Sequence, residues 1–449
     1  MNCLSISLNK AAKDGAFHYH SKCQRSELTH LCFADDLLIF CEGSVQSVQA
    51  VLAILKDFED RSGLAVNIAK TSLFAAGIKP HELDQIKQAT WLTEGTLPVR
   101  YLEVPLCTKK LSITNCAPLL QAIKSKLHSW TTRTLSFAGR LQLLASVIAG
   151  ITNFWSCAFI LPKACLAEID SLCSRFLWKG KTEGHNSAKV SWASVTTPKK
   201  EGGLGLKNLL VWNRAAALKL IWILFFKQDS IWSNWFIREI LQGDINNFWV
   251  INTRQKHSWQ ANQLLLLREH AYSWIRRTIG NGETTYFWSC NLSPFGRITD
   301  YLGDEPSSQV GIATTATIAE LWDIDHWVLP PARSDNQLQC TSSGLKETIG
   351  SIVVPTAPLI PSPLKSIELS EEGLLASAMN RPDYPPRCYS FGSPPTCDHY
   401  LSSRPIDQAL LCFLQVSSFS SMTPYNGLLC VLSGYGFSIY FGFFLVMAT

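Results

Sequence analysis

Two adjacent carboxylates, Asp35 and Asp36, are the residues of this sequence best placed to carry out chemistry. Apolar runs at residues 29–33 and 37–41 flank them, which predicts a tight hairpin with the carboxylates at its tip. Because adjacent negative charges repel unless cations neutralise them, oxygen ligands at this point suit Mg²⁺. Two such ions support phosphoryl transfer, since they activate the attacking hydroxyl and stabilise the leaving oxygen. Taken alone, the pair is better explained as a solvated turn, because short motifs arise by chance.

The residues around the carboxylates predict the elements that hold them. A helix is expected between Ser44 as its N-cap and Gly63 as its stop, and a strand is expected at residues 65–68. Short strands alternate with helical patterns over the first hundred residues, and long helical patterns begin at Pro118. The sequence therefore predicts an α+β fold.

Three segments that follow one another in the sequence carry a family resemblance. They read LTHLCFADDLLIF, SGLAVNIAKTSLF and YLEVPL. In this order they resemble the consecutive palm motifs of reverse transcriptases from plant LINE-like (non-LTR) retrotransposons. Several motifs in the right order are far harder to obtain by chance than one.

The resemblance assigns roles to residues of the palm. It implies that Asp35 and Asp36 are catalytic and bind Mg²⁺. It places Phe33 in the aromatic position before them and Lys70 near an incoming nucleotide, in the same segment as Asn67. A solvated lysine at a strand end explains Lys70 equally well. In YLEVPL, Glu103 stands where the family has glycine; a glutamate is strained if the backbone φ there is positive, which fits decay of function.

The resemblance continues to about residue 340 and predicts a helical thumb. The segment from Arg100 to Gly280 contains 24 lysines and arginines against nine aspartates and glutamates, a balance that suggests a polyanionic partner. In the thumb-like part, Lys124, Lys126, Arg133 and Arg140 could contact phosphates. For any single one of them, the polar face of a packed helix is the better explanation.

Five regions are expected along the chain. They are a partial palm at residues 1–106, a helical thumb-like region at 107–241, a mixed connection region at 242–343, a Pro- and Ser-rich irregular segment at 344–425 and an uncharged apolar tail at 426–449. The tail is long enough to cross a bilayer as a helix. A random reading frame explains its composition about as well.

Cysteine spacing indicates reduced thiols and not metal ligands. Cys157, Cys165 and Cys173 recur every eight residues, and we expect them to be buried. No signal-peptide pattern opens the sequence, so we expect an intracellular protein, nuclear or cytoplasmic.

The expected function is that of a remnant of an RNA-directed DNA polymerase whose partners are an RNA or DNA template and primer, with Mg²⁺ and no small-molecule cofactor. The fingers and the first catalytic aspartate of the family are not found before Asp35, so we expect the chain to be inactive alone. One alternative is a non-catalytic nucleic-acid-binding protein. Another is a protein anchored in a membrane by its C-terminal tail.

Overall fold

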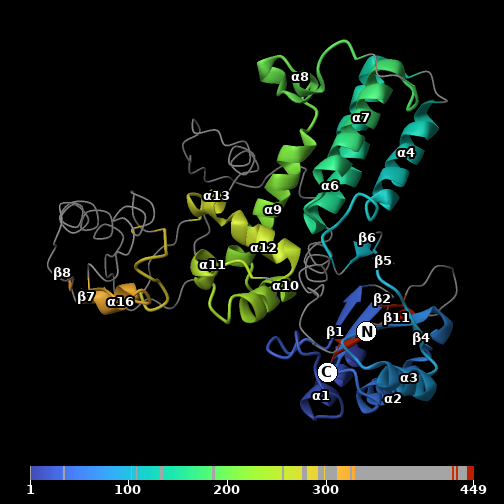
Figure 1. The fold of residues 1–449 in the computed structure, drawn as a ribbon, viewed down its shortest axis with the longest axis vertical. Helices are drawn as coiled ribbons and strands as arrows, with labels where there is room; N and C mark the ends of the chain where they lie inside the picture. The colour runs from blue at the N-terminus through green and yellow to red at the C-terminus, as the bar shows by residue number, and fades with distance from the viewer. Residues whose placement is uncertain are drawn as a thin grey trace.

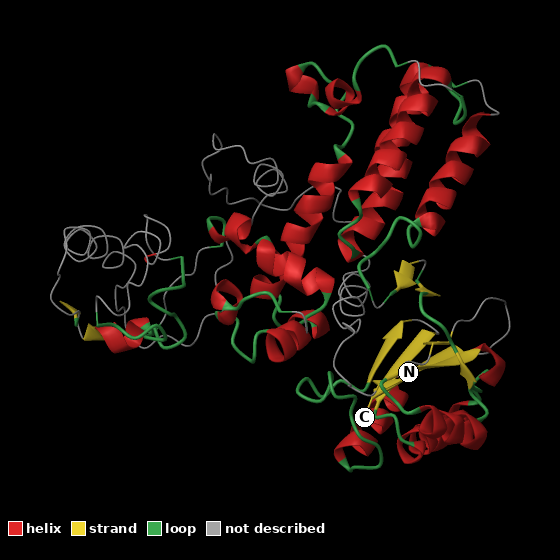
Figure 2. Cartoon of the chain, viewed as in Figure 1, coloured by secondary structure: helices red, strands yellow, loops and turns green. Residues whose placement is uncertain are grey.

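The computed structural model describes residues 2–33, 36–102, 104–107, 109–131, 135–184, 188–254, 257–275, 281–291, 298, 311–323, 326–328, 427–428, 431–432 and 442–448. Helices predominate in this part of the chain, and short strands form one larger sheet and two small pairs (Figure 2). The predicted α+β class is confirmed.

The N-terminal unit is a sheet with helices packed beneath it (Figure 1). Its helices are α1 Asn2–Lys13, α2 Val45–Ser62, the 3₁₀ turn η1 Ile68–Lys70 and α3 Pro80–Thr90; its strands are β1 His30–Phe33, β2 Asp36–Cys41, β3 Thr71–Ala76, β4 Thr93–Glu94, β5 Val99–Tyr101 and β6 Val104–Leu106. Strands β1 and β2 form the predicted antiparallel hairpin.

Strands from the C-terminal end of the chain complete this sheet. They are β9 Gly427–Leu428, β10 Val431–Leu432 and β11 Gly442–Ala448, and the strand order is β1-β2-β11-β9-β3-β10. Strand β11 runs parallel to β2 on one edge and pairs in parallel with β3 as well. The C-terminal segment thus fills the position between the two apolar strands of the N-terminal unit.

The tail does not form the expected membrane-spanning helix where it is described. Residues 427–428, 431–432 and 442–448 are strands and not part of the helix that the composition of 426–449 made possible. The physical reason is that β2 and β3 offer peptide groups that need partners, and the residue types Phe, Leu and Val of the tail favour strands. The composition alone did not distinguish the two outcomes.

The remaining elements are mainly helical. In chain order they are α4 Ala117–Thr131, α5 Phe137–Leu143, the π-helical turn η2 Leu144–Ile148, α6 Ala149–Ala158, α7 Lys163–Lys179, α8 Trp192–Thr196, η3 Lys199–Glu201, α9 Leu209–Phe226, α10 Ile231–Trp235, η4 Phe236–Ile240, α11 Asn247–Val250, α12 Trp259–Leu266, α13 Arg268–Tyr272, α16 Ile318–Leu321, β7 Trp322–Asp323 and β8 His326–Trp327. Figure 1 shows α4, α6 and α7 side by side above the sheet.

Aromatic and thiol side chains form much of the helical core, as expected. Trp155 is buried, and the ring centroids of Trp130 and Phe176 lie 5.9 Å apart between α4 and α7. Cys157, Cys165 and Cys173 are buried, which confirms that prediction. Burial raises the pKa of the Cys157 and Cys173 thiols, so these groups stay protonated near neutral pH.

Two helical stretches are apolar and long enough to cross a membrane by length and composition. They are Phe137–Ala158 and Leu209–Phe226, of which 44% and 50% are buried inside the protein. Helix α9, the second of them, packs against α6, α7, α10, α12 and α13. Its apolar character on all sides therefore matches a central core helix.

Hydrogen bonds connect the N-terminal unit to the helical part, among them one from Arg25 Nη1 to the backbone oxygen of Arg238 at 3.4 Å. Trp235 Nε1 donates to the backbone oxygen of Lys22 at 2.7 Å, and Arg238 Nη1 donates to that of Arg25 at 2.6 Å. The loop between α1 and β1 is therefore held against α10 and η4.

Strand β11 provides the first test. In Leu445→Pro, the peptide N–H that lies between Ile39 of β2 and Leu73 of β3 is removed. We expect the free energy of unfolding to fall by about 1–3 kcal/mol, because a buried peptide group loses its partner. Urea denaturation measures the change, and Leu445→Val is the matched control that keeps the N–H. Equal stability of the two variants would show that β11 does not hold the sheet together.

Two histidines with lowered pKa values, the partly buried His30 and the buried His20, provide the second test. His30 joins β1 to α1, since its Nε2 lies 2.8 Å from Ser5 Oγ and its Nδ1 lies 2.7 Å from Thr29 Oγ1. Burial lowers the pKa of His30 to about 4, and burial together with nearby Lys22 lowers that of His20 to about 3. Both side chains are thus neutral in the folded protein at pH 5, whereas unfolded histidine is protonated below about pH 6.5.

The unfolded chain therefore binds more protons between pH 6.5 and pH 4, and stability must fall as the pH is lowered through this window. Each histidine contributes a slope of up to about 1.4 kcal/mol per pH unit. Urea denaturation at pH 7.5, 6.0 and 5.0 should show this loss, and His30→Gln should reduce it by roughly 1 kcal/mol per pH unit. A His30→Gln profile parallel to the wild-type profile would assign the pH dependence to other groups.

Candidate active site

The predicted hairpin is present, and the structure describes one of its two aspartates, Asp36. Phe33 at the end of β1 pairs with Asp36 at the start of β2, so the strands are joined at this point by residues 34 and 35. Asp36 and Phe33 are partly buried. Asp35 lies outside the described residues. The described geometry therefore supports one carboxylate at the hairpin tip with an aromatic residue opposite it.

The burial of the other residues of β2 explains why Asp36 lies at the beginning of the strand. The residues from Leu37 to Cys41 are all 3% exposed or less. Because consecutive strand residues point to opposite faces, both faces of β2 are covered. A carboxylate could not be accommodated further along this strand without the cost of burying its charge. Asp36 therefore stands where the buried strand begins.

Helix α2 leads from this strand to the next predicted site residue. Ser44 caps it by accepting a hydrogen bond from the Ser47 N–H at 3.2 Å, and Gly63 ends it with a φ of 72°. Both predictions are confirmed. A glycine suits this last position because the left-handed region is costly for other residues.

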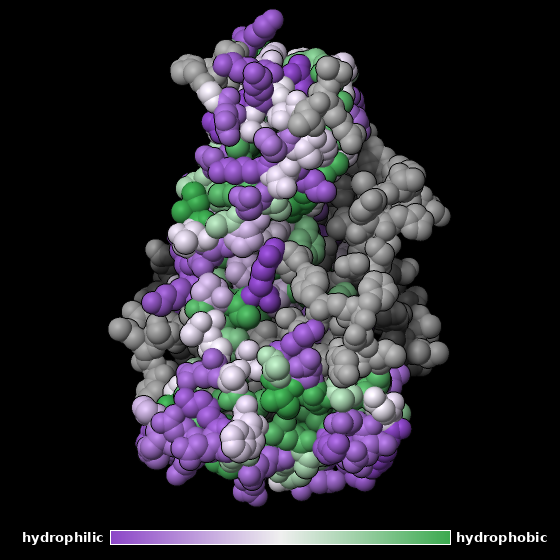
Figure 3. Space-filling model, turned by 90° about the vertical axis from the view of Figure 1, so that its right-hand side faces the viewer, coloured by the Kyte–Doolittle hydropathy of each residue, from purple (hydrophilic) through white to green (hydrophobic). Residues whose placement is uncertain are grey.

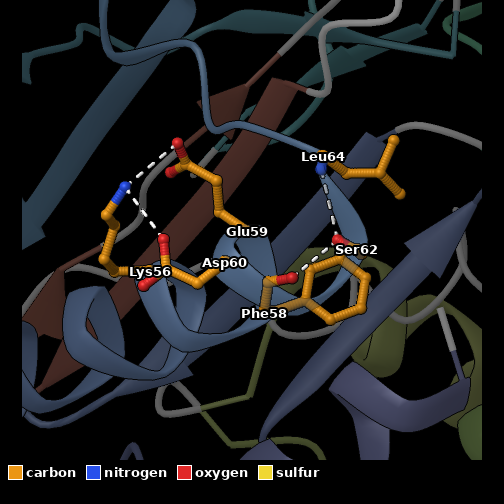
Figure 4. Close-up of polar contacts among 6 residues, drawn as sticks. All are labelled: Lys56, Phe58, Glu59, Asp60, Ser62 and Leu64. Carbon is orange, nitrogen blue, oxygen red and sulfur yellow. Dashed lines mark hydrogen bonds and ion pairs between the residues drawn. The ribbon is translucent and has the colours of Figure 1, made fainter.

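Figure 4 shows how the last turns of α2 are closed. Lys56 Nζ lies 3.2 Å from a carboxylate oxygen of Glu59 and 3.3 Å from one of Asp60. The Ser62 hydroxyl donates to the backbone oxygen of Phe58 at 2.6 Å and accepts from the Leu64 N–H at 3.2 Å. The exposed ion pairs contribute little energy, whereas the serine contacts direct the chain out of the helix toward residues 67–70.

Asn67 organises the turn that presents Lys70. Its Oδ1 accepts a hydrogen bond from the Lys70 N–H at 3.2 Å, and its backbone oxygen accepts one from the Thr71 hydroxyl at 2.7 Å. Residues 68–70 thus form a 3₁₀ turn, and the strand begins at Thr71. The predicted strand at 65–68 is wrong because this side-chain cap draws the backbone into a turn. Lys70 is exposed immediately before β3.

The strand register brings Asp36 and Lys70 to the same end of the sheet. Phe444 of β11 pairs with Leu38 on one side and with Ser72 on the other. Asp36 begins β2 two residues before Leu38, and Lys70 lies in the turn two residues before Ser72. Since neighbouring strands lie about 4.8 Å apart and β11 intervenes, the strands β2 and β3 are separated by about 10 Å. The fold thus places the start of β2, with Asp36, and the turn that carries Lys70 at the same end of the sheet.

The described residues do not make a complete magnesium site. No group of three or more His, Cys, Asp or Glu side chains that could hold a metal occurs within the part of the chain that the structure describes. The backbone position paired with Asp36 on the β11 side is Gly442, which carries no ligand. Asp36 could supply one oxygen ligand to Mg²⁺, and no catalytic step through the ion follows from this set.

The hairpin after β4 contains an unexpected backbone strain. Tyr101 of β5 pairs with Val104 of β6, so residues 102 and 103 form the connecting turn. Leu102 has a φ of 46°, a region that is costly for a bulky side chain. The sequence interpretation placed the strain at Glu103, which lies outside the described residues. Strain in this turn is thus present, at a neighbouring residue.

The predicted thumb residues differ in their surroundings. Lys124 Nζ lies 4.0 Å from the Glu168 carboxylate of α7, so it has an internal partner. Arg140 belongs to α5, and its guanidinium lies against Gly180 at the C-terminal end of α7. The two are so close that a Cβ on Gly180 would come within 2.7 Å of Arg140 Nη1. A cation is favourable at a helix C-terminus. Lys126 is exposed on α4, and Arg133 lies outside the described residues.

Comparisons with known proteins identify the segment that contains this edge of the sheet. The family described as Reverse transcriptase (RNA-dependent DNA polymerase) matches residues 4–106. A candidate ribonuclease H protein of Arabidopsis thaliana is 31% identical over 193 residues, which cover 41% of this chain and 30% of that protein. The chain thus spans less than a third of this curated relative. Residues 4–106, which include Asp36 and Lys70, are similar to the reverse transcriptase domain.

Proposed function

We propose that this chain is a reverse-transcriptase-like protein of the plant non-LTR (LINE-like) retrotransposon type, which binds RNA and DNA but does not polymerise DNA by itself. The observation that carries the proposal is the placement of Asp36 and Lys70 at one end of the sheet, inside the segment that matches the reverse transcriptase family. A carboxylate and a lysine at the same end of a sheet suit a metal-bound triphosphate and its charge.

The non-LTR assignment is supported by similarity beyond the sheet. The three motifs occur in the family's order, and the resemblance continues to about residue 340. The match to the Arabidopsis relative is 193 residues long, which is longer than the segment from residue 4 to residue 106. The similarity therefore includes sequence outside the palm-like region.

Nucleic-acid binding is supported by the charge of the helical part. The segment from Arg100 to Gly280 has 24 basic against nine acidic residues. Figure 3, which is coloured by hydropathy and not by charge, shows hydrophilic side chains over the upper part of one face, at the height of α4 and α7 in Figure 1, and on both sides of an apolar area lower down over the N-terminal unit. A basic surface binds polyanions through release of their counterions.

Absence of polymerisation is supported by the way the sheet is completed. Two-metal catalysis needs a carboxylate from a strand other than the Asp35–Asp36 hairpin. Strand β11 occupies the position beside Asp36, and residues 426–449 include no aspartate or glutamate. This strand cannot supply the missing ligand.

The third test is primer extension. The purified chain, given an RNA template, a DNA primer and either Mg²⁺ or Mn²⁺, is expected to add no nucleotides, because the ligands for two ions are incomplete. The double variant Asp35→Asn, Asp36→Asn is the control for contaminating polymerase. Extension by the wild-type chain that disappears in the double variant would show that another residue completes the site and would overturn this part of the proposal.

The fourth test is salt-dependent binding. Fluorescence anisotropy of a labelled RNA at several salt concentrations should give weaker binding as salt rises, without sequence preference. Lys126→Ala should lower the slope of log affinity against log salt by about one if Lys126 contacts a phosphate. Lys56→Ala is the matched control, because Lys56 is already paired with Glu59 and Asp60. An RNA affinity that is undetectable at low salt would contradict the binding function.

A further inference from the structure

A small hollow lies where the chain leaves the N-terminal unit and enters the helices. Three segments that are distant in the sequence line it, namely Lys109, Lys110 and Leu111 after β6, Phe159 and Ile160 after α6, and Trp259 and Gln260 at the start of α12. It holds about 280 Å³ of space, its open mouth included. Most of this space is open to solvent, so a ligand would lie across the mouth of the hollow and not inside an enclosed cavity.

The base of the hollow is held by buried contacts. Phe159 and Leu111 are 1% and 3% exposed. The Gln260 side chain is also buried, and its Nε2 donates to the backbone oxygen of Ala158 at 2.9 Å, which fixes the start of α12 against the end of α6. Ser258 caps α12 by accepting from the Ala261 N–H at 3.1 Å. The position of Trp259 is therefore set by its neighbours in the fold.

The rim of the hollow is basic and one wall is aromatic. Lys109 and Lys110 are exposed, and Trp259 is partly buried. Lys110 Nζ lies 5.2 Å from the centre of the Trp259 ring, within range of a cation–π contact. Within the described residues, neither lysine has an ion pair with a carboxylate. Two cations beside an indole combine charge for a phosphate with a flat surface for a base.

We propose that the open mouth of this hollow binds one nucleotide of a single-stranded nucleic acid, with the base stacked on the accessible part of Trp259 and the adjoining phosphates at Lys109 and Lys110. This inference rests on the proposed nucleic-acid-binding function and names a place for it. An acidic peptide would use the two lysines but gains little from the accessible part of the indole. A nucleic-acid strand uses both features, because every base presents a π-face whatever its sequence.

The experiment uses the full chain and a fluorescein-labelled oligouridylate, with fluorescence anisotropy as the readout. Trp259→Ala should weaken binding roughly 5- to 150-fold, the range expected for loss of one stacked base. Trp259→Phe, which keeps an aromatic ring, should restore most of the affinity. Trp91→Ala is the matched control, because Trp91 is 83% exposed at the end of α3 in the N-terminal unit; it should bind like the wild type.

The lysines give a second readout, which does not depend on whether the fold tolerates the loss of the partly buried Trp259 side chain. The double variant Lys109→Gln, Lys110→Gln alters two exposed side chains and should lower the salt slope by about 1.4, the value for two phosphate contacts on a single strand. Trp259→Ala should leave that slope unchanged. This difference separates a stacking role from a charge role.

The outcomes separate the two proposals. If the wild type binds the oligonucleotide, and both Trp259→Ala and the double lysine variant bind equally well with an unchanged slope, nucleic-acid binding stands and this site is refuted. If the wild type does not bind at low salt, the proposed function fails together with the site. Competition by a polyglutamate peptide that depends on Trp259 as strongly as oligonucleotide binding does would reassign the hollow to acidic peptides.

Discussion

Strand β2 needs partners on both edges and cover on both faces, and the arrangement of the N-terminal unit depends on this constraint. Leu38, Ile39 and Cys41 are fully buried. A peptide group left without a partner in such surroundings costs about 1–3 kcal/mol, so an open edge along β2 would be strongly unfavourable. Strand β1 pairs with one edge and β11 with the other. Because β11 also pairs with β3, the C-terminal segment sets the distance between β2 and β3.

The same register determines what the end of the sheet can do. Asp36 and Lys70 are brought together by backbone pairing and not by their charges. At the roughly 10 Å that separates β2 from β3, two opposite unit charges in water attract each other by only about 0.4 kcal/mol. The geometry therefore persists whether or not either group is ionised. It also means that a strand carrying an acidic residue at the position of Gly442 would lie directly beside Asp36, since these two positions are partners in the register.

Local sequence signals predicted the local structure correctly. Predictions failed where the structure of a segment depends on contacts that the local sequence pattern does not show, most of them with residues far away in the sequence. The Ser44 cap, the Gly63 stop and the strands around the carboxylates are all encoded within a few residues, and they were found. The strand after α2 was misplaced because Asn67 accepts from the Lys70 N–H, a contact that periodicity does not show. The position of β11 could not be inferred, since its partners in β2 are about four hundred residues away and an uncharged apolar tail fits a helix equally well. The Trp259 hollow was missed for the same reason.

The excess of lysines and arginines in the helical part does not by itself show which of them can bind nucleic acid, because some are paired within the protein. Lys124 lies near Glu168, and Arg140 lies against the end of α7 beside Gly180, so part of the positive charge stabilises the helices themselves. Lys109 and Lys110 are different, because the buried Leu111 anchors their segment while their own side chains remain exposed at the junction after β6. A phosphate contact costs these two lysines no internal ion pair within the described part of the chain. Lysines on an anchored segment that have no carboxylate partner in the described part of the chain are better suited to binding a phosphate than a larger number of cations paired within packed helices.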